Sequence, residues 1–313
     1  MKPNPTRALL LLLTTLCAGA ALWAADAKAP AASAPPDPAA YRKEIEAWRQ
    51  KRIEGLKRED GWLTLVGLYW LKPGENRFGS DPGNPVILPE GKAPGVAGTF
   101  TLEKDTVRLS VQPGVALTAD GKPVPPGMTV SADATGKPTI LQLGSLTFYV
   151  IKRGDRMGVR IKDKTSPMLA HFQGIDEYPI RPEWRVVARF EPYKDKKIPI
   201  ANIIGQVSDE KSPGALVFDW RGKTYRIDAL EGGEDGSLFL VFGDQTNGKE
   251  TYGAGRFLDT DPPKDGKVVV DFNTAYNPPC AFTAFATCPL PPAQNKLALR
   301  VEAGEKKVAG GHS

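Results

Sequence analysis

Histidine and cysteine are scarce in this sequence, which has two His and three Cys among 313 residues. Zinc sites in proteins take several Cys or His ligands, so we expect no metal site, and we expect no bound cofactor. There is no Gly-x-Ser-x-Gly motif, and a Ser-His-Asp triad would depend on His171, because His312 lies in the C-terminal tail. The stretch GKETYGAGRF (248–257) is not followed by Lys-Ser or Lys-Thr, which excludes a phosphate-binding P-loop.

The sequence also lacks a strong excess of either charge. It has 41 Lys and Arg against 36 Asp and Glu, a formal net charge of +5. Basic residues nowhere cluster with aromatic residues, as they do in many nucleic-acid-binding proteins. We therefore expect no nucleic-acid partner and no strong association with membranes after signal cleavage.

The N-terminus has the pattern of a secretory signal peptide over residues 1–25. Lys2 and Arg7 precede an apolar run that ends in small residues. An uncleaved membrane anchor is one alternative, because the run is long enough to span a bilayer. Attachment of a lipid at Cys17 is another. Residues 26–40 are rich in Ala, Pro and Ser and predict a disordered linker, so we expect a periplasmic or secreted protein.

The remainder of the chain predicts a mainly β protein: two β-sandwich or barrel-like units preceded by one N-terminal amphipathic helix. Residues 38–60 have an apolar face at helical spacing, formed by Tyr41, Ile45, Trp48 and Leu56. Segment 62–71 (WLTLVGLYWL) fits either a buried strand or a short core helix. Beyond it, short alternating runs separated by Gly and Pro are typical of strands.

Pro and Gly cluster again at 164–183, which predicts a boundary between the two β units. We assign the helix and the first β unit to residues 41–165, the second β unit to 166–305, and a disordered tail to 306–313. Within the second unit, alternating runs flank Arg221-Gly222, a pattern that predicts a β-hairpin.

Several unusual stretches carry a resemblance to a known family. They are GWLTLVGLYWLKPGENRFGS (61–80), ARFEPY (188–193), PGALVFDW (213–220), GKETYGAGRF (248–257) and VDFNTAYNPPCAFTAFATCPLPP (270–292). Together they are similar to the bacterial domain of unknown function 1684 family, from about residue 41 to residue 305. That family has no established activity, so the resemblance implies membership without a mechanism.

Residues 75–150 carry a second resemblance, to forkhead-associated domains. The order of ENRFGSDPGNPVILPEG, TADGKPV and LQLGSLTFYV is similar to that family, whose members are β-sandwiches that read phosphothreonine. Arg77 stands where the family has an Arg, but PGVAGTF (94–100) lacks the Ser-His pair. The resemblance therefore implies a sandwich fold and not phosphopeptide binding.

Polar and aromatic side chains concentrate in two loops, 244–257 and 271–289, among Gly and Pro that restrict the backbone. We predict that these loops form a ligand pocket in which Arg256 binds an anionic or polar group. Core packing of the aromatic residues is the alternative. The predicted ligand-binding residues are Tyr252, Arg256, Asn273, Tyr276 and Asn277.

Carboxylates surround the same loops: Asp244, Glu250, Asp259, Asp261 and Asp271. Two carboxylates across a cleft are the arrangement that glycoside hydrolases use. Turn capping and calcium binding are the alternatives. The candidate catalytic residues are Asp244, Glu250, Asp271 and His171.

Cys280 and Cys288 are the two cysteines that remain after signal cleavage. In an oxidising compartment, a pair this close predicts a disulfide that holds the Pro-rich loop. The leading interpretation is a small-ligand or carbohydrate-binding envelope protein with a small-molecule or glycan partner. A carboxylate-dependent hydrolase and a purely structural or interaction module are the alternatives, which leaves open whether the protein is an enzyme.

Overall fold

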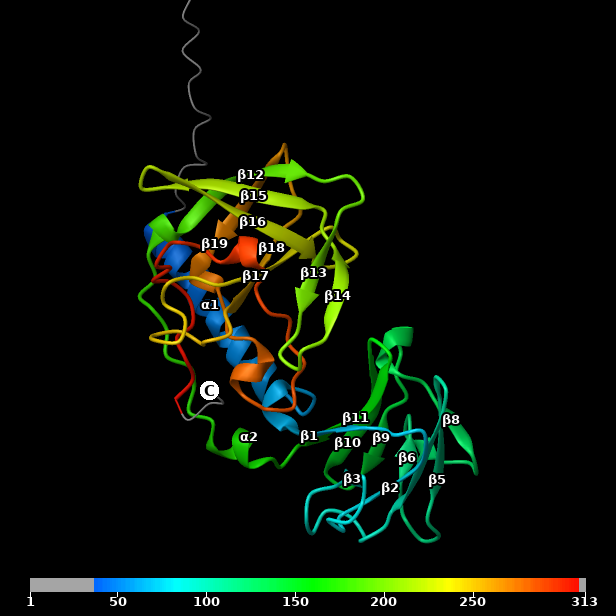
Figure 1. The fold of residues 1–313 in the computed structure, drawn as a ribbon. Helices are drawn as coiled ribbons and strands as arrows, with labels where there is room; N and C mark the ends of the chain where they lie inside the picture. The colour runs from blue at the N-terminus through cyan, green and yellow to red at the C-terminus, as the bar shows by residue number, and fades with distance from the viewer. Residues whose placement is uncertain (1–36, 310–313) are drawn as a thin grey trace, which may run out of the picture. The chain divides into compact units, whose positions relative to one another are not determined.

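The computed structural model describes residues 37–309. The predicted signal peptide, most of the predicted linker, Cys17 and His312 lie outside the described residues. Within residues 37–309 the chain is mainly β with one long N-terminal helix, as the sequence predicts (Figure 1). Among these residues, no helix combines the length and the apolar character needed to cross a bilayer.

The N-terminal helix α1 (Pro38–Lys57) begins inside the predicted linker, because residues 38–40 are already helical. Asp37 caps it, since its carboxylate accepts hydrogen bonds from two backbone N–H groups of the first turn, and Pro38 fits that turn without loss of a bond. Its predicted apolar face is largely confirmed, because Tyr41, Ile45 and Leu56 are buried.

The first β unit consists of two sheets whose apolar faces share one core. Alternation along the strands explains this, since β5 buries every second side chain. Three rings lie at its centre, with centroid distances of 4.8 Å between Phe78 and Phe100 and 5.9 Å between Phe78 and Phe148. One sheet has the order β1 (Leu65–Trp70), β11 (Arg156–Asp163), β10 (Leu146–Arg153), β9 (Leu141–Leu143), β6 (Thr118–Ala119) and β7 (Lys122–Pro123). The other has the order β3 (Val86–Ile87), β2 (Gly74–Gly79), β4 (Gly98–Glu103), β5 (Thr106–Val111) and β8 (Met128–Val130).

The second β unit is built on one six-stranded sheet that nearly closes into a barrel. Its core contains Trp184, which stacks on Trp220 with ring centroids 4.1 Å apart. The strand order is β18 (Arg256–Thr260), β17 (Leu238–Phe242), β16 (Lys223–Glu231), β15 (Gly214–Trp220), β12 (Arg185–Pro192) and β19 (Lys267–Asp271). A separate hairpin is formed by β13 (Lys197–Ala201) and β14 (Val207–Lys211).

The predicted hairpin of the second unit is confirmed. Trp220 of β15 pairs with Lys223 of β16, and Arg221 and Gly222 form the turn with φ angles of 48° and 77°. Two successive positive φ angles are what a two-residue hairpin turn requires. Segment 62–71 contains both predicted forms, since the 3-10 helix η1 (Trp62–Thr64) leads into β1.

Short helices occupy some connections between strands and the segment after β19. They are η2 (Asp133–Thr135), α2 (Pro167–His171), η3 (Pro182–Trp184), η4 (Phe272–Thr274), η5 (Pro279–Ala281) and η6 (Ala293–Asn295).

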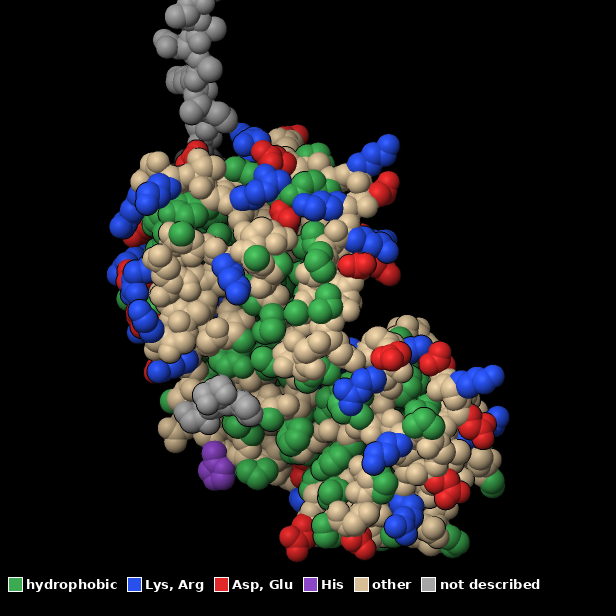
Figure 2. Space-filling view, in the orientation of Figure 1, with side chains coloured by type: hydrophobic (Ala, Val, Ile, Leu, Met, Phe, Trp, Pro, Cys, Tyr) green, Lys and Arg blue, Asp and Glu red, His purple; other side chains and the backbone are tan. Residues whose placement is uncertain are grey.

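Helix α1 packs against the second β unit, although the predicted division groups it with the first. The hydroxyl of Tyr41 donates to Oδ2 of Asp271 at 2.7 Å, and Nη2 of Arg49 donates to the carbonyl oxygen of Tyr178 at 2.9 Å. The start of the predicted tail is also held, because the backbone N–H of Lys306 donates to the carbonyl oxygen of Asp176 at 2.7 Å. On the face shown in Figure 2, basic and acidic side chains are interspersed over both β units.

Candidate functional site

Arg256, the predicted anion-binding residue, is fully buried and holds the C-terminal segment in place. Its guanidinium donates to the carbonyl oxygens of Val301 and Ala303 and lies 3.4 Å from Oδ1 of Asp244. Burial lowers the pKa of Arg256, an effect that the carboxylate of Asp244 opposes. These contacts position β18 against the chain terminus and leave Arg256 no opening toward a ligand.

Three more predicted ligand-binding residues are also buried and bonded within the protein. The amide of Asn273 donates to the hydroxyl of Tyr41 at 2.9 Å, and the amide of Asn277 donates to the carbonyl oxygen of Lys306 at 2.7 Å. The hydroxyl of Tyr252 donates to the carbonyl oxygen of Cys280 at 3.1 Å. These hydrogen bonds hold the loops in place. The fifth predicted residue, Tyr276, lines an aromatic cavity.

The candidate catalytic residues do not converge. Asp244 pairs with Arg256 in the interior, while Glu250 is exposed and lies 2.6 Å from Nη2 of Arg300. Asp271 accepts from Tyr41, and exposed His171 contacts only the carbonyl oxygen of its own helix at Pro167. None of the four lines any of the three cavities described below. Among residues 37–309, no three His, Cys, Asp or Glu side chains group as metal ligands do.

Tyr276 lies in an aromatic pocket of about 460 Å³ between α1 and the edge of the second sheet. Its ring centroid is 6.3 Å from that of Trp48 on α1 and 5.9 Å from that of Phe257 on β18. The backbone supports this placement, because the N–H groups of Phe257 and Tyr276 each donate to the other's carbonyl oxygen at 2.9 Å. We call this cavity the aromatic pocket, lined by Trp48, Lys51, Arg52, Trp62, Phe239, Phe257, Asp259, Tyr276 and Pro279.

A carboxylate and a guanidinium supply the polar groups of the aromatic pocket. The hydroxyl of Tyr276 donates to Oδ2 of Asp259 at 2.9 Å. Arg52 lies over the face of Tyr276, 4.7 Å from the ring centroid, and is held there by Oε1 of Glu305 at 3.0 Å and the carbonyl oxygen of Asn277 at 2.9 Å. Because Glu305 already neutralises Arg52, the pocket has no large net charge.

The apolar walls raise the pKa of Asp259, whose carboxylate lies among aromatic rings. Loss of water around the carboxylate is the main cause, and the hydrogen bond from Tyr276 and the charge of Arg52 both oppose it. Burial also raises the pKa of Tyr276, and the charge of Asp259 adds to the effect. The tyrosine therefore stays a hydrogen-bond donor, while Asp259, which is exposed to solvent, presents an acceptor to the pocket.

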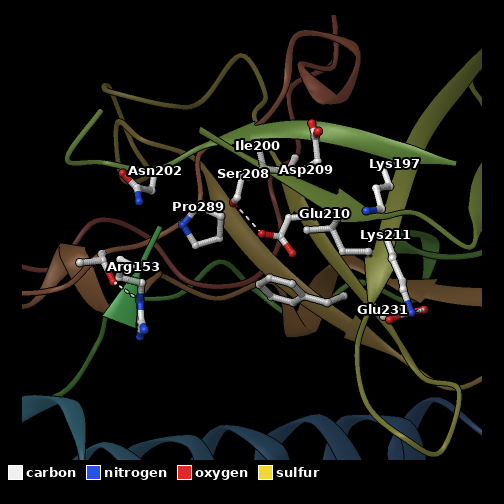
Figure 3. Close-up of a pocket in the computed structure, with 13 residues that line it drawn as sticks. Arg153, Lys197, Ile200, Asn202, Ser208, Asp209, Glu210, Lys211, Glu231 and Pro289 are labelled. Carbon is white, nitrogen blue, oxygen red and sulfur yellow. Dashed lines mark hydrogen bonds and ion pairs between the residues drawn. The ribbon is translucent and has the colours of Figure 1, made fainter. Parts of the chain in front are cut away.

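A second cavity, of about 600 Å³, lies beside the β13–β14 hairpin and is lined mostly by charged and polar side chains (Figure 3). Nζ of Lys211 is 3.8 Å from Oε1 of Glu231, and the hydroxyl of Ser208 donates to Glu210 at 2.6 Å. Most of its charged groups are exposed to water and several already pair with one another. Hydrogen bonds or ion pairs from these groups to a ligand would therefore add little binding free energy.

A third cavity, of about 270 Å³, is small and mostly apolar. Tyr252 and Cys280 line it together with Ile203, Gly253, Ala254, Thr283, Ala284 and Ala286. Both Cys280 and Cys288 are buried free thiols, and the backbone N–H of Cys280 donates to Sγ of Cys288 at 3.1 Å. The disulfide between them stays a prediction.

The sequence reasoning missed most of the aromatic pocket. The sequence pattern predicts Trp48 on the apolar face of the helix and singles out neither Lys51 nor Arg52. The three positions nevertheless follow a spacing of i, i+3 and i+4, which puts them on one side of a helix. An aromatic residue next to two basic residues on one side of a helix is a pattern from which this wall of the pocket can be predicted. Trp62 and Phe239 lie in ordinary apolar runs and carry no local signal, whereas Phe257 ends the predicted loop 244–257.

Comparison with known proteins agrees with the family resemblance. The family of proteins of unknown function DUF1684 matches residues 170–306, a segment that contains β17, β18 and Tyr276 but not α1. The chain is also similar to an uncharacterised protein of Haloarcula marismortui with a solution NMR structure, at 29% identity, a TM-score of 0.38, and coverage of 44% of this chain and 78% of that one. No curated protein matches the chain. Residues 170–306 of this chain thus match the DUF1684 family of proteins of unknown function, which supports the resemblance drawn from the sequence.

Proposed function

We propose that this protein binds a small ligand in the aromatic pocket, and that the ligand is an uncharged sugar or a short glycan. The observation that carries the proposal is the meeting of Trp48 and Tyr276 with the carboxylate of Asp259 in an open cavity. Its volume of about 460 Å³ falls in the range of about 300–1,000 Å³ that is usual for small-molecule sites.

Sugars present an apolar face of C–H groups and an edge of hydroxyl groups, and the pocket matches both. The rings of Trp48, Trp62 and Tyr276 supply flat apolar surface. Among the described residues, the side chain of Asp259 accepts a hydrogen bond from Tyr276 alone, through Oδ2, so Oδ1 has capacity for a ligand hydroxyl. Arg52, neutralised by Glu305, is a donor whose charge does not demand an anion.

A cationic ligand fits the pocket less well, although aromatic rings with a carboxylate often bind cations. Arg52 already covers the face of Tyr276, and Lys51 lines the same cavity, so a further cation meets two like charges. The N-terminal pattern of Lys2, Arg7 and the apolar run after it supports binding outside the cytoplasm, as part of the same proposal.

The test is a panel of mono- and disaccharides measured by thermal shift and by quenching of tryptophan fluorescence. Trp48 and Trp62 line the pocket, so a bound sugar should change the fluorescence saturably and raise the melting temperature of the folded protein. We expect Asp259→Asn to weaken binding about ten-fold or more, because a hydrogen bond to a charged acceptor is lost.

Asp209→Asn is the matched control, because Asp209 lines the charged cavity of Figure 3 and carries the same side chain. Its affinity for the sugar should equal that of the unchanged protein. If the Asp259→Asn and Trp48→Ala variants both bound the sugar as tightly as the unchanged protein, the sugar would bind outside the aromatic pocket. Absence of a saturable response to every sugar at millimolar concentration would overturn the proposal.

A further inference from the structure

Two cysteines, Cys280 and Cys288, lie in the Pro-rich loop, and neither lines the aromatic pocket. Cys280 and Cys288 are each 4% exposed, and each thiol shifts the pKa of the other. The backbone N–H of Cys280 donates to Sγ of Cys288 at 3.1 Å. The loop therefore brings the two cysteines together.

The two thiols differ in access. Cys280 lines the small apolar cavity of about 270 Å³, and Cys288 is not among its lining residues. The other walls are short side chains, including Ala254, Ala284 and Ala286, which leave room beside the sulfur of Cys280. A small molecule that enters this cavity therefore meets Cys280 first.

The pKa shifts of the two thiols also favour attack by Cys280 before Cys288. The neighbouring Cys288 thiol lowers the pKa of Cys280, against the effect of burial. The neighbouring Cys280 thiol and burial raise the pKa of Cys288. Thiolates are the attacking species in disulfide chemistry, so Cys280 is the better nucleophile of the pair.

Arg160 of β11 contacts Thr287, the residue before Cys288. Its side chain is 4% exposed, its Nη2 donates to the hydroxyl of Thr287 at 3.3 Å, and its Nε has no hydrogen-bond partner among the described residues. Its charge lowers the pKa of Cys288, opposite to the larger effects of burial and of Cys280. A buried cation there stabilises the negative charge that passes from one sulfur to the other during exchange.

We propose that Cys280 and Cys288 form a thiol–disulfide exchange site for small-molecule disulfides, in which Cys280 attacks and Cys288 resolves. In the first step the Cys280 thiolate attacks one sulfur of the external disulfide, whose S–S bond breaks, forming a mixed disulfide and releasing one thiolate. In the second step the Cys288 sulfur, having lost its proton, attacks the Cys280 sulfur and releases the other thiolate. The protein loses two electrons and two protons as its disulfide forms. The external disulfide takes up the two electrons and two protons and becomes two thiols.

The site is independent of the proposed sugar binding, and its test does not use a sugar. The reduced full-length protein is mixed with oxidised glutathione, quenched with acid, and mapped by peptide mass spectrometry. We expect Cys288→Ser to accumulate glutathione at residue 280, because no resolving thiol is present. We expect Cys280→Ser to gain glutathione at residue 288 at least about ten-fold more slowly.

The unchanged protein is the second measurement and guards against variants that misfold. At early times its adduct should lie on Cys280, and at late times it should carry the Cys280–Cys288 disulfide without glutathione. Equal reaction rates at the two positions would overturn the assignment of roles. Reaction only in urea, or a disulfide present from isolation that dithiothreitol cannot reduce in the folded protein, would show a purely structural bond and overturn the exchange site.

Discussion

The hydroxyl of Tyr276 and Oδ2 of Asp259 are 2.9 Å apart, and this bond joins the loop after η4 to strand β18. It opposes the burial that raises the pKa of Asp259. In Tyr276→Phe this opposing hydrogen bond is absent, so the pKa of Asp259 should rise further. An NMR titration of the Asp carboxyl carbons measures the shift directly, and Asp209 in the charged cavity serves as the unaffected reference.

The Tyr276–Asp259 pair should make the proposed sugar binding depend on pH. A ligand hydroxyl donates a stronger hydrogen bond to the ionised carboxylate of Asp259 than to the neutral acid, so affinity should fall as the pH drops through the raised pKa of Asp259. The loss should set in at a higher pH in Tyr276→Phe than in the unchanged protein. Calorimetric titration of the sugar at several pH values tests this, and identical pH profiles for the two proteins would contradict it.

Replacement of Arg256 by Met should strongly destabilise the protein. Asp244 and the carbonyl oxygens of Val301 and Ala303 would then lose a buried donor, and breaking one partner of a buried ion pair costs about 3–5 kcal/mol. Urea unfolding measures the change. Arg300→Met is the matched control, because Arg300 also pairs with a carboxylate, Glu250, but at the surface. A similar loss in both variants would show that burial does not decide the effect.

Glu177 should make stability depend on pH near neutrality. Loss of water raises its pKa to about 7 from an ordinary 4.5, Arg49 opposes the shift and Glu305 adds to it. Between pH 4.5 and 7 the folded protein keeps a proton that the unfolded chain has released, so stability falls as the pH rises through this window. The stability that protonated Glu177 contributes is fully present below pH 4.5 and is lost above pH 7.

Melting temperatures across this pH range test the sign of the effect. The difference between Glu177→Gln and the unchanged protein should move in favour of the variant as the pH rises to about 7, then level off. Glu54→Gln, on the exposed face of α1, should give a difference that does not follow this window. A difference that moved toward the unchanged protein as the pH rose would contradict the prediction.

Gly304 and Gly222 separate two effects of adding a methyl group. Both have positive φ angles, 76° and 77°, so alanine strains the backbone at either position, by about 1–2 kcal/mol. A Cβ at Gly304 would also lie 2.3 Å from the carbonyl oxygen of Ala275, whereas nothing lies within 4 Å at Gly222. We expect Gly304→Ala to cost on the order of 3 kcal/mol or more in urea unfolding. Equal decreases in the free energy of unfolding of the two variants would mean that the loop around Ala275 can move to accommodate the methyl group at little cost.

Local chemistry explains what the sequence predicted well. Asp37 and Pro38 start α1 through bonds within one turn, and Arg221-Gly222 closes its hairpin through the φ angles of two neighbouring residues. Such features depend on neighbours in the chain, so they can be recognised without knowledge of the fold.

The site depends on contacts that no local pattern carries. Arg256 follows a polar Gly-rich stretch and begins β18, where it donates to carbonyl groups of residues 301 and 303. Trp48 meets Tyr276 only because α1 packs beside the edge of the second sheet. The burial of a cation and the meeting of two rings are both set by packing between distant segments, so no local sequence pattern indicates them.

The contact between Arg52 and Glu305 spans 253 positions of the chain. During synthesis, the first helix leaves the ribosome long before the carboxylate that fixes its arginine over Tyr276. The aromatic pocket is therefore finished only when nearly the whole chain has been made, and a protease that removes the last residues would dismantle it from the far end. Formation of the pocket thus depends on a hydrogen bond between α1 and a residue near the end of the described chain.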